Sequence, residues 1–366
     1  MSDESLGEWR SDYVVSRGVL PSQWVNGAPN EAELHCHCLD ERTWIFRFSK
    51  WQGVVHSGKA EYQDAYEGNF CFCFIGDAIA VLWDTGPVPR SALKAALESL
   101  LPSPGTLDLV IAHTHSHDDH VAGDCMWNSA APSPFKSIRI VGHAPSAVID
   151  FFAVPPAPSS LPCEGPSLET AQFDLGGRAL ELFHIPGHEP AAIAVYDPIT
   201  NILVTGDNLY PGRCDAVYNV QHAAAASRHR SADPLLCPSS ANIDIEPSRF
   251  RFVPFIVLTV LSRLYVRDAP AFTASAVRMA AFVERLGATL ASSLRVLGCH
   301  IEMTSTAGVD YPTGTLHQPC EAPYALTAEH VADVALRCVT ALRESDNGTL
   351  PRIVCDRYII EPVAAG

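Results

Sequence analysis

Short apolar runs rich in β-branched residues recur between residues 66 and 206, where they alternate with helical patterns and are separated by proline and glycine. Runs of this length bounded by turn residues are typical of buried strands. The segments that we predict as strands in this way are residues 69–75, 78–83, 107–112, 179–183, 202–207 and, later in the chain, 294–300. Strand and helix patterns therefore alternate clearly as far as residue 206.

Two later segments have apolar residues spaced by three and four positions, which is the period of an amphipathic helix. In the first segment these residues are Phe272, Ala276, Met279, Val283 and Leu286. In the second, which begins after Thr327 as a candidate N-cap, they are Val331, Val334, Ala335, Cys338 and Leu342. We therefore predict one helix before the strand at 294–300 and another near the end of the chain.

The same patterns divide the chain unevenly. Residues 1–65 are predicted to form an N-terminal extension with a first strand around 43–49, and residues 66–366 a single domain. Within that domain residues 212–250 lack periodicity, and a structureless loop of such length is unusual in a compact domain. We predict an irregular insertion at about 214–263. A lid over a site, a disordered insertion and a translated retained intron are three open interpretations of it.

Composition and charge exclude some classes of partner. The chain has 366 residues, 47% of them hydrophobic, and a net charge of −16, which argues against binding to a phosphate backbone. The most apolar late stretch, 252–261, has about half of the roughly 20 residues that a membrane-spanning helix needs. Twelve cysteines without a recognisable secretion signal favour reduced thiols. We therefore expect a cytoplasmic protein that binds neither nucleic acid nor a membrane.

The clearest chemical signal is His115-x-His117-x-Asp119-His120, which begins where the predicted strand 107–112 ends. His115 and His117 project to the same side of an extended segment, because side chains alternate with a period of two. Asp119 and His120 follow in the turn that opens the next helix. Neutral imidazoles and a carboxylate, with no thiolate among them, suit zinc or iron in an open catalytic site. The motif therefore predicts metal binding.

Further candidate site residues follow the ends of other predicted strands. They are Asp84 before Thr85-Gly86, His188 in Pro186-Gly187-His188, Asp207 after Gly206, and His300 after Cys299. Together with the histidine-rich motif, this ordered set resembles the metallo-β-lactamase superfamily over roughly residues 65–305, apart from the insertion. The resemblance implies an α/β fold of the αββα sandwich type, in which two sheets face each other, helices lie outside and metals lie at one edge.

The resemblance also implies a site for two metal ions. One ion would be held by His115, His117 and His188, the other by Asp119, His120 and His300, and Asp207 would bridge them. Two Zn²⁺ per chain are expected, although Mn²⁺ or Fe²⁺ would also suit these ligands. Water shared by two cations has a lowered pKa and gives a bridging hydroxide near neutral pH. Asp119 is then the candidate catalytic residue, which carries a proton towards the leaving group.

Two more residues are assigned to the surroundings of the metals. We predict that Asp84 orients a ligand histidine or the motif loop, although a turn-forming aspartate before Thr85-Gly86 fits the local sequence equally well. Tyr210, three residues after Asp207, is the candidate for a substrate-facing hydroxyl, and an ordinary loop tyrosine is the alternative.

Other histidines and cysteines are interpreted as structural. Alternation along a strand places His35 and His37 on one face and Cys36 and Cys38 on the other, so these four cannot all hold one ion. The remaining candidates, which we predict to be buried core, strand or pocket-wall residues, are Cys71, Cys73, Cys299, His143 and His184. His113 precedes the motif by two positions and can face the same side as His115, but the pattern of the similar family does not use it as a ligand.

The predicted function is hydrolysis of an ester, thioester, lactone or lactam in a small-molecule substrate. A mononuclear-iron persulfide dioxygenase is the alternative, but that branch of the superfamily needs no final histidine, so His300 together with Asp207 counts against it. A non-catalytic binding protein on the same fold is disfavoured because no ligand is missing. Neither the substrate nor the oligomeric state follows from the sequence, and no basic residues typical of glutathione binding are recognised in the C-terminal part.

Overall fold

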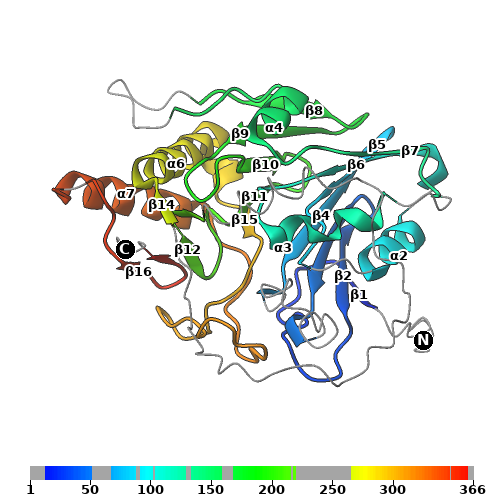
Figure 1. The fold of residues 1–366 in the computed structure, drawn as a ribbon, viewed down its shortest axis with the longest axis horizontal. Coiled ribbons are helices and arrows are strands. Elements are labelled where there is room, and N and C mark those ends of the chain that lie inside the picture. Colours follow the sequence, from blue (N-terminus) through cyan, green and yellow to red (C-terminus); the bar gives the residue numbers. More distant parts are fainter. Residues whose placement is uncertain are drawn as a thin grey trace, which may run out of the picture.

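The computed structural model describes residues 13–51, 67–87, 91–101, 104–128, 133–158, 168–215, 217–219, 265–346 and 348–361. Within these ranges the chain forms two main β-sheets that face each other, with helices on the outer side of each sheet (Figure 1).

The first sheet has seven strands arranged in the order of the sequence. They are β1 (Tyr13–Arg17), β2 (Leu34–Asp40), β3 (Thr43–Phe48), β4 (Phe70–Ile75), β5 (Ile79–Trp83), β6 (Asp108–Ala112) and β7 (Ser137–Ile140). Neighbouring strands from β2 to β5 are antiparallel, whereas β5, β6 and β7 are parallel to one another. The carboxyl ends of β5, β6 and β7 therefore lie at one edge of this sheet.

The second sheet has five strands in the order β15-β11-β10-β9-β8. They are β8 (Ala171–Asp174), β9 (Ala179–His184), β10 (Ile193–Asp197), β11 (Ile202–Gly206) and β15 (Arg295–Gly298). β11 and β15 are parallel, and β10 is antiparallel to both β9 and β11. Strands β9, β11 and β15 therefore run in one direction, and their carboxyl ends also share an edge.

Three apolar layers hold the two sheets and the helices together. Alternate residues of both sheets meet in the central layer, for example Phe72 and Val110 with Leu182 and Val204. The outer face of the second sheet packs against α6 (Ala269–Ala291) and α7 (Ala328–Glu344). The outer face of the first sheet packs against α2 (Ser91–Leu100). This is the αββα sandwich that the resemblance implied.

Strand β4 illustrates how the sequence produces these layers. Phe70, Phe72 and Phe74 face the other sheet, whereas Cys71 and Cys73 face the layer under α2. Both cysteine side chains are fully buried, which confirms their prediction as small core residues. The nine cysteines whose side chains are described are free thiols.

The two helices predicted from their apolar spacing are confirmed as α6 and α7. The side chain of Asp268 caps α6 by accepting a hydrogen bond from the backbone N–H of Ala271, and Thr327 is the N-cap of α7, as predicted. The shorter helices are α3 (Asp118–Val121) and α4 (Pro145–Phe152), with single 3₁₀ turns at η2 (Pro104–Thr106) and η3 (Ala122–Met126).

The N-terminal extension contains more structure than the sequence indicated. The single strand expected around residues 43–49 is β3, but β1 and β2 precede it, and β3 pairs with β4 in the same sheet. Hydrogen bonding of the first sheet therefore crosses the proposed division between residues 65 and 66. The short β1 mixes polar and apolar residues, so it carries no readable period.

Four short strands and one two-residue strand form two small additional sheets. β12 (Arg213–Asp215) pairs with β17 (Ile359–Glu361), which also pairs with β16 (Ile353–Val354), and β13 (Val217–Asn219) pairs with β14 (Tyr265–Arg267). Residues 214–215 and 217–219 of the predicted insertion at 214–263 therefore lie in strands. The rest of it, from residue 220, lies outside the described residues.

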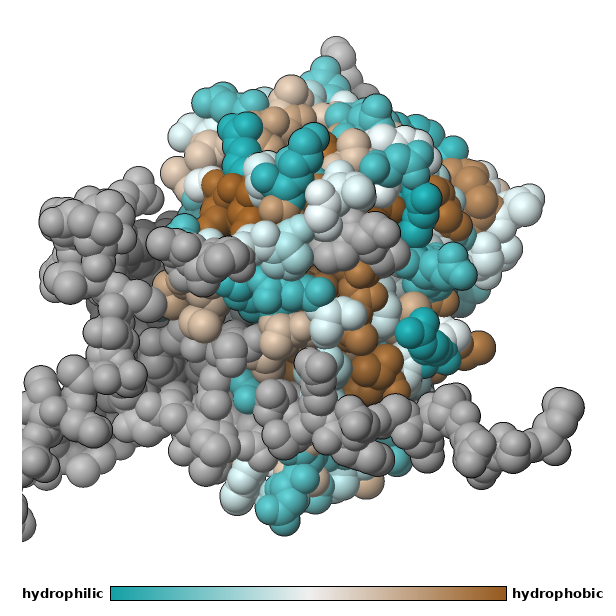
Figure 2. All heavy atoms as spheres, turned by 90° about the vertical axis from the view of Figure 1, so that its right-hand side faces the viewer, coloured by the Kyte–Doolittle hydropathy of each residue, from teal (hydrophilic) through white to brown (hydrophobic). Residues whose placement is uncertain are grey.

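None of the described helices is both long and apolar enough to cross a membrane. On the face shown in Figure 2, apolar residues lie in separate patches among polar ones. Scattered exposure of this kind is usual on protein surfaces and needs no partner to explain it.

Candidate metal centre

The seven predicted metal ligands come from four connections at the shared edge of the two sheets. His115 and His117 follow β6, Asp119 and His120 lie in α3, His188 follows β9, Asp207 follows β11 and His300 follows β15. Because the preceding strands all end at this edge, residues that are far apart in the sequence converge in space.

His115, His117 and His188 form the first group. Nε2 of His115 lies 3.1 Å from Nδ1 of His117 and 3.3 Å from Nε2 of His188, and the last two atoms are 3.0 Å apart. Nitrogens at about 2.0 Å from a tetrahedral zinc ion lie roughly 3.3 Å from one another. The spacing of these three imidazoles therefore suits one ion with a fourth position left open.

Asp119, His120 and His300 form the second group. Oδ2 of Asp119 lies 3.1 Å from Nε2 of His120 and 3.4 Å from Nε2 of His300. Together with Asp207, these residues offer ligand atoms that all lie within 4.8 Å of one another, and all four side chains are buried. One carboxylate and two imidazoles again match the ligand types of a borderline divalent ion.

Asp207 lies between the two groups. Its Oδ2 is 3.1 Å from Nε2 of His300 and 3.4 Å from Nε2 of His120, and it is 3.7 Å from Nε2 of both His115 and His188. Its Oδ1 is buried without a hydrogen-bond partner among the described residues. A buried carboxylate oxygen without a donor is unfavourable, and a cation would satisfy it. The residues present therefore fit a pair of bridged metal ions.

Burial keeps two histidines of the first group, His115 and His117, neutral. It lowers the pKa of His115 well below the usual value, and the nearby His120 adds to this effect. It lowers the pKa of His117 to about 3, with a further contribution from His188. Unprotonated imidazoles are the form that binds a metal ion.

In the second group, attraction between opposite charges outweighs burial. Burial alone would raise the pKa of Asp119 and of Asp207, but His120 and His300 hold both values well below the usual range. Burial would likewise lower the pKa of His120 and of His300, but the carboxylates raise both well above the usual value. The positive charges of the two protonated histidines thus balance the negative charges of the two carboxylates, as a bound divalent cation would do.

Asp84 lies behind the second group and contacts His120. It accepts hydrogen bonds from the backbone N–H and the hydroxyl of Thr114, at 2.7 and 2.8 Å, and its Oδ2 lies 2.9 Å from Nδ1 of His120. The thiol of Cys299, buried as predicted, also donates to Oδ2, at 3.3 Å. A carboxylate on the second nitrogen of a ligand histidine fixes its tautomer and orientation. This contact corresponds to the orienting role expected for Asp84.

The Pro-Gly-His loop depends on glycine to place His188. Gly187 has φ of 135°, and a Cβ at this position would lie 2.3 Å from the Cα of Phe272 in α6. No other residue could approach the helix so closely without moving it. The loop is thereby held between the sheet edge and α6.

Two polar residues beside the second group were missed by the sequence analysis. Asn69 is fully buried, and its Nδ2 lies 2.7 Å from Oδ2 of Asp119 and 3.1 Å from Nε2 of His120. A carboxylate oxygen of Glu67 lies 3.6 Å from Nε2 of His300. Asn69 directly precedes β4, which is antiparallel to β5, so it lies at the edge where β5 ends. A polar residue at the start of the apolar run 69–75 was the signal that could have identified it.

Comparison with known proteins agrees with this geometry. The model of the metallo-beta-lactamase superfamily matches residues 67–236, a segment that contains six of the seven converging residues, all but His300. Over this segment the chain is similar to the metallo-beta-lactamase superfamily.

The relatives found among known proteins match only part of this chain. A hydroxyacylglutathione hydrolase of Pseudomonas aeruginosa is 28% identical over 132 residues, which cover 36% of this chain and 43% of that protein. A hydroxyacylglutathione hydrolase of Thermosynechococcus vestitus is 25% identical over 140 residues, which cover 36% and 49%. This chain thus spans less than half the length of these curated relatives. A solved metallo-beta-lactamase from Pontibacter korlensis aligns with a TM-score of 0.39 and 14% identity, over 84% of this chain and 99% of that one.

Other residues considered in the sequence analysis have partners of their own. The hydroxyl of Tyr210 donates to Glu302 at 3.2 Å, and its ring lies 5.3 Å from that of His300. Tyr210 is therefore next to the candidate centre, although only 6% of it is exposed. His35 and His37 both bond to the hydroxyl of Ser16, at 2.7 and 2.8 Å. They are not among the clusters of metal-ligand type in the described part of the chain.

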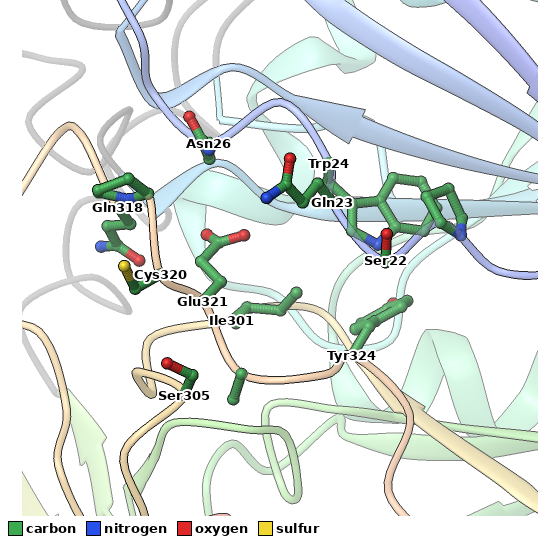
Figure 3. A pocket seen from close by; sticks show the side chains of 13 residues that line it. Ser22, Gln23, Trp24, Asn26, Ile301, Ser305, Gln318, Cys320, Glu321 and Tyr324 are labelled. Atoms are coloured by element: carbon green, nitrogen blue, oxygen red, sulfur yellow. The ribbon is translucent and has the colours of Figure 1, made fainter.

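A polar cavity of about 270 Å³ lies beside the centre, between residues 21–26 and 301–324 (Figure 3). Ile301, the residue after His300, forms part of its wall, and Gln23, Gln318 and Glu321 line it. None of the seven converging residues lines this cavity. It is therefore separate from the candidate metal centre.

Proposed function

We propose that this protein is a metal-dependent hydrolase that cleaves a carbonyl compound of small size, with two Zn²⁺ ions per chain held by the seven converging residues. The observation that carries the proposal is the position of Asp207, whose Oδ2 lies within 3.7 Å of ligand nitrogens from both groups. Nitrogen and oxygen ligands of this kind also suit Mn²⁺ and Fe²⁺.

When bound, two such cations lower the pKa of a shared water and polarise the carbonyl group of a substrate. The residues of the chain would hold and orient the reacting groups. Nδ1–H of His120 would donate a hydrogen bond to Asp84, which leaves Nε2 unprotonated and free to act as a ligand. Asp119 would accept the proton of the attacking water and return it to the leaving group, since its carboxylate lies within the second group, beside His120 and His300.

Among the four bond types predicted from the sequence, we propose thioesters as the first to test. Two curated relatives, each matching 36% of this chain, are hydroxyacylglutathione hydrolases. In thioester hydrolysis the carbon–sulfur bond breaks, water supplies the new carboxylic acid oxygen, and the proton held by Asp119 passes to the sulfur. A thiolate is a good leaving group, so the sulfur needs to receive this proton only after the carbon–sulfur bond has largely broken.

The proposal is tested with purified protein and two variants. The protein should contain two zinc ions and hydrolyse an acyl thioester, an activated ester or a lactone in the absence of oxygen. His188→Ala should lose metal from the first group and reduce turnover by more than the roughly 10–100-fold that loss of a partner behind a ligand costs. Asp119→Asn should lose turnover while the protein stays folded.

Two results would contradict the proposal. One is wild-type metal content and turnover in His188→Ala, which would remove this residue from the centre. The other is a strict need for oxygen and iron with no hydrolysis, which would assign the protein to the dioxygenase branch that the sequence analysis left as the alternative.

A further inference from the structure

A second cluster of ligand-type side chains lies outside the seven converging residues. It consists of His113, Asp124 and His143, which the sequence analysis treated separately or left out. Nε2 of His113 lies 2.9 Å from Oδ1 of Asp124, and Nε2 of His143 lies 2.8 Å from Oδ2 of the same carboxylate. One ligand atom from each of the three residues can be chosen so that all lie within 4.8 Å of one another.

The fold fixes the positions of all three side chains. His113 directly follows β6 and His143 follows β7, two parallel neighbours whose pairing continues in the hydrogen bond from Val141 N to Ile111 O, 2.8 Å long. Asp124 belongs to η3, which lies against Thr85, because the hydroxyl of Thr85 donates to Oδ1 of Asp124 at 2.9 Å. The cluster therefore lies at the same sheet edge as the candidate metal centre.

We propose that His113, Asp124 and His143 bind one additional divalent transition-metal ion, of which Zn²⁺ is the probe to use. Two imidazoles and one carboxylate form an open three-ligand site for zinc or ferrous iron. The ion replaces the two imidazole N–H protons that now face the carboxylate, and the hydrogen bond from Thr85 continues to orient Asp124.

The exposure of the three side chains matches such a site. The side chain of His113 is 3% exposed and that of Asp124 14%, so the burial of these two ligands limits their motion. That of His143 is 37% exposed, which gives an ion a path of entry and leaves room for water in its open positions. The alternative is a clamp in which Asp124 simply accepts hydrogen bonds from two histidines.

The experiment counts metal ions in wild-type protein and in His143→Ala. Metal-free protein is incubated with Zn²⁺, freed of unbound ions by gel filtration, and analysed by elemental mass spectrometry. The wild type should retain one zinc ion more than His143→Ala. The exposed His317, outside every cluster, provides the matched control, and His317→Ala should retain the wild-type number. The prediction concerns a difference of one ion, so it does not depend on how many ions the other centre holds.

Equal zinc content in the wild type and His143→Ala would overturn the proposal and leave the hydrogen-bonded clamp. If His143→Ala does not fold, His143→Gln replaces it, since glutamine preserves a polar side chain at this half-exposed position. Crystals of the wild type grown with Zn²⁺ give an independent answer. An anomalous peak among His113, Asp124 and His143 supports the site, and its absence at full occupancy of the other centre overturns it.

Discussion

Oδ2 of Asp84 lies 2.9 Å from Nδ1 of His120, and neither side chain is exposed to solvent. Asp84 adopts φ of 68°, a left-handed conformation that costs a non-glycine residue roughly 1–2 kcal/mol. The bonds that it accepts from Thr114 and its contact with His120 hold it there. The backbone conformation at the end of β5 is thus coupled to the orientation of one candidate ligand.

Asp84→Asn should weaken the second metal position without emptying the first. Asparagine keeps the size of the side chain but has one acceptor oxygen in place of two, so it cannot serve both Thr114 and His120 in the same way. We expect a roughly 10–100-fold loss of metal affinity at the position formed by Asp119, His120 and His300. Competition with a chelator of known affinity measures it. Asp77→Asn, at an exposed site, is the control, and unchanged affinity in Asp84→Asn would refute the coupling.

Asn69→Leu separates a role in the metal centre from a role in the fold. The amide of Asn69 donates to Asp119, but its own oxygen has no hydrogen-bond partner among the described residues. Replacing it by an apolar side chain of similar size therefore removes its contacts with Asp119 and His120 together with one unsatisfied atom, and the free energy of unfolding should change by only about 1 kcal/mol. Affinity for the second metal ion and turnover should both fall, by roughly 10–100-fold. A large loss of stability with normal metal binding would show that Asn69 is merely structural.

The strands next to the site could be predicted because their apolar runs are long enough to show a pattern. The run 107–112 locates β6, and the period of two in an extended chain then places His115 and His117 together. The ordered motifs added the remaining ligands by resemblance. All of these predictions depend on local sequence or on the order of motifs, and both are visible without a structure.

Contacts between distant segments could not be predicted in this way. Local sequence left two interpretations of Asp84, because the choice depends on His120, which lies 36 residues later. Asn69 stood out only as the polar start of an apolar run. Asp124 contacts His113 and His143 because η3 lies against the ends of the strands that precede these histidines. No periodicity in the sequence predicts this packing.

Arg178 provides a test of how the two sheets are held together. Its guanidinium donates twice to Asp197 in the second sheet, at 3.0 and 2.7 Å, and it also donates to the carbonyl of Arg42 and the hydroxyl of Thr43 on the first sheet. Arg178→Met leaves Asp197 as a buried charge without its cation, so we expect the free energy of unfolding to fall by about 3–5 kcal/mol. Chemical denaturation measures this change.

A second substitution checks the cause of that loss. Asp197→Asn in the Arg178→Met background removes the unpaired charge and should restore part of the stability. The zinc content of the folded variants should stay at the wild-type value, because neither residue belongs to the candidate centre. If Arg178→Met alone lowers the free energy of unfolding by less than about 1 kcal/mol, the ion pair contributes little net stability.

The stability of the protein should depend on pH through His35, which lies far from the candidate ligands in the sequence. Its ring packs 4.9 Å from that of Trp24, and burial, together with His37 and Arg47, lowers its pKa from 6.5 to about 4. The unfolded chain therefore binds more protons than the folded one between these two values. The neutral ring contributes its full stability above about pH 6.5, and this contribution is lost as the pH falls towards 4.

His35→Gln should make the protein less sensitive to acid, because glutamine does not titrate in this range. Between pH 7 and pH 4.5 the free energy of unfolding of the wild type should fall by roughly 1–2 kcal/mol more than that of the variant. Urea denaturation at the two pH values measures the difference, and comparing the two proteins cancels the titration of the groups that they share. His317→Ala, which removes an exposed imidazole, should retain the wild-type dependence. Parallel pH profiles for the wild type and His35→Gln would show that the buried ring does not titrate with the shift that its surroundings imply.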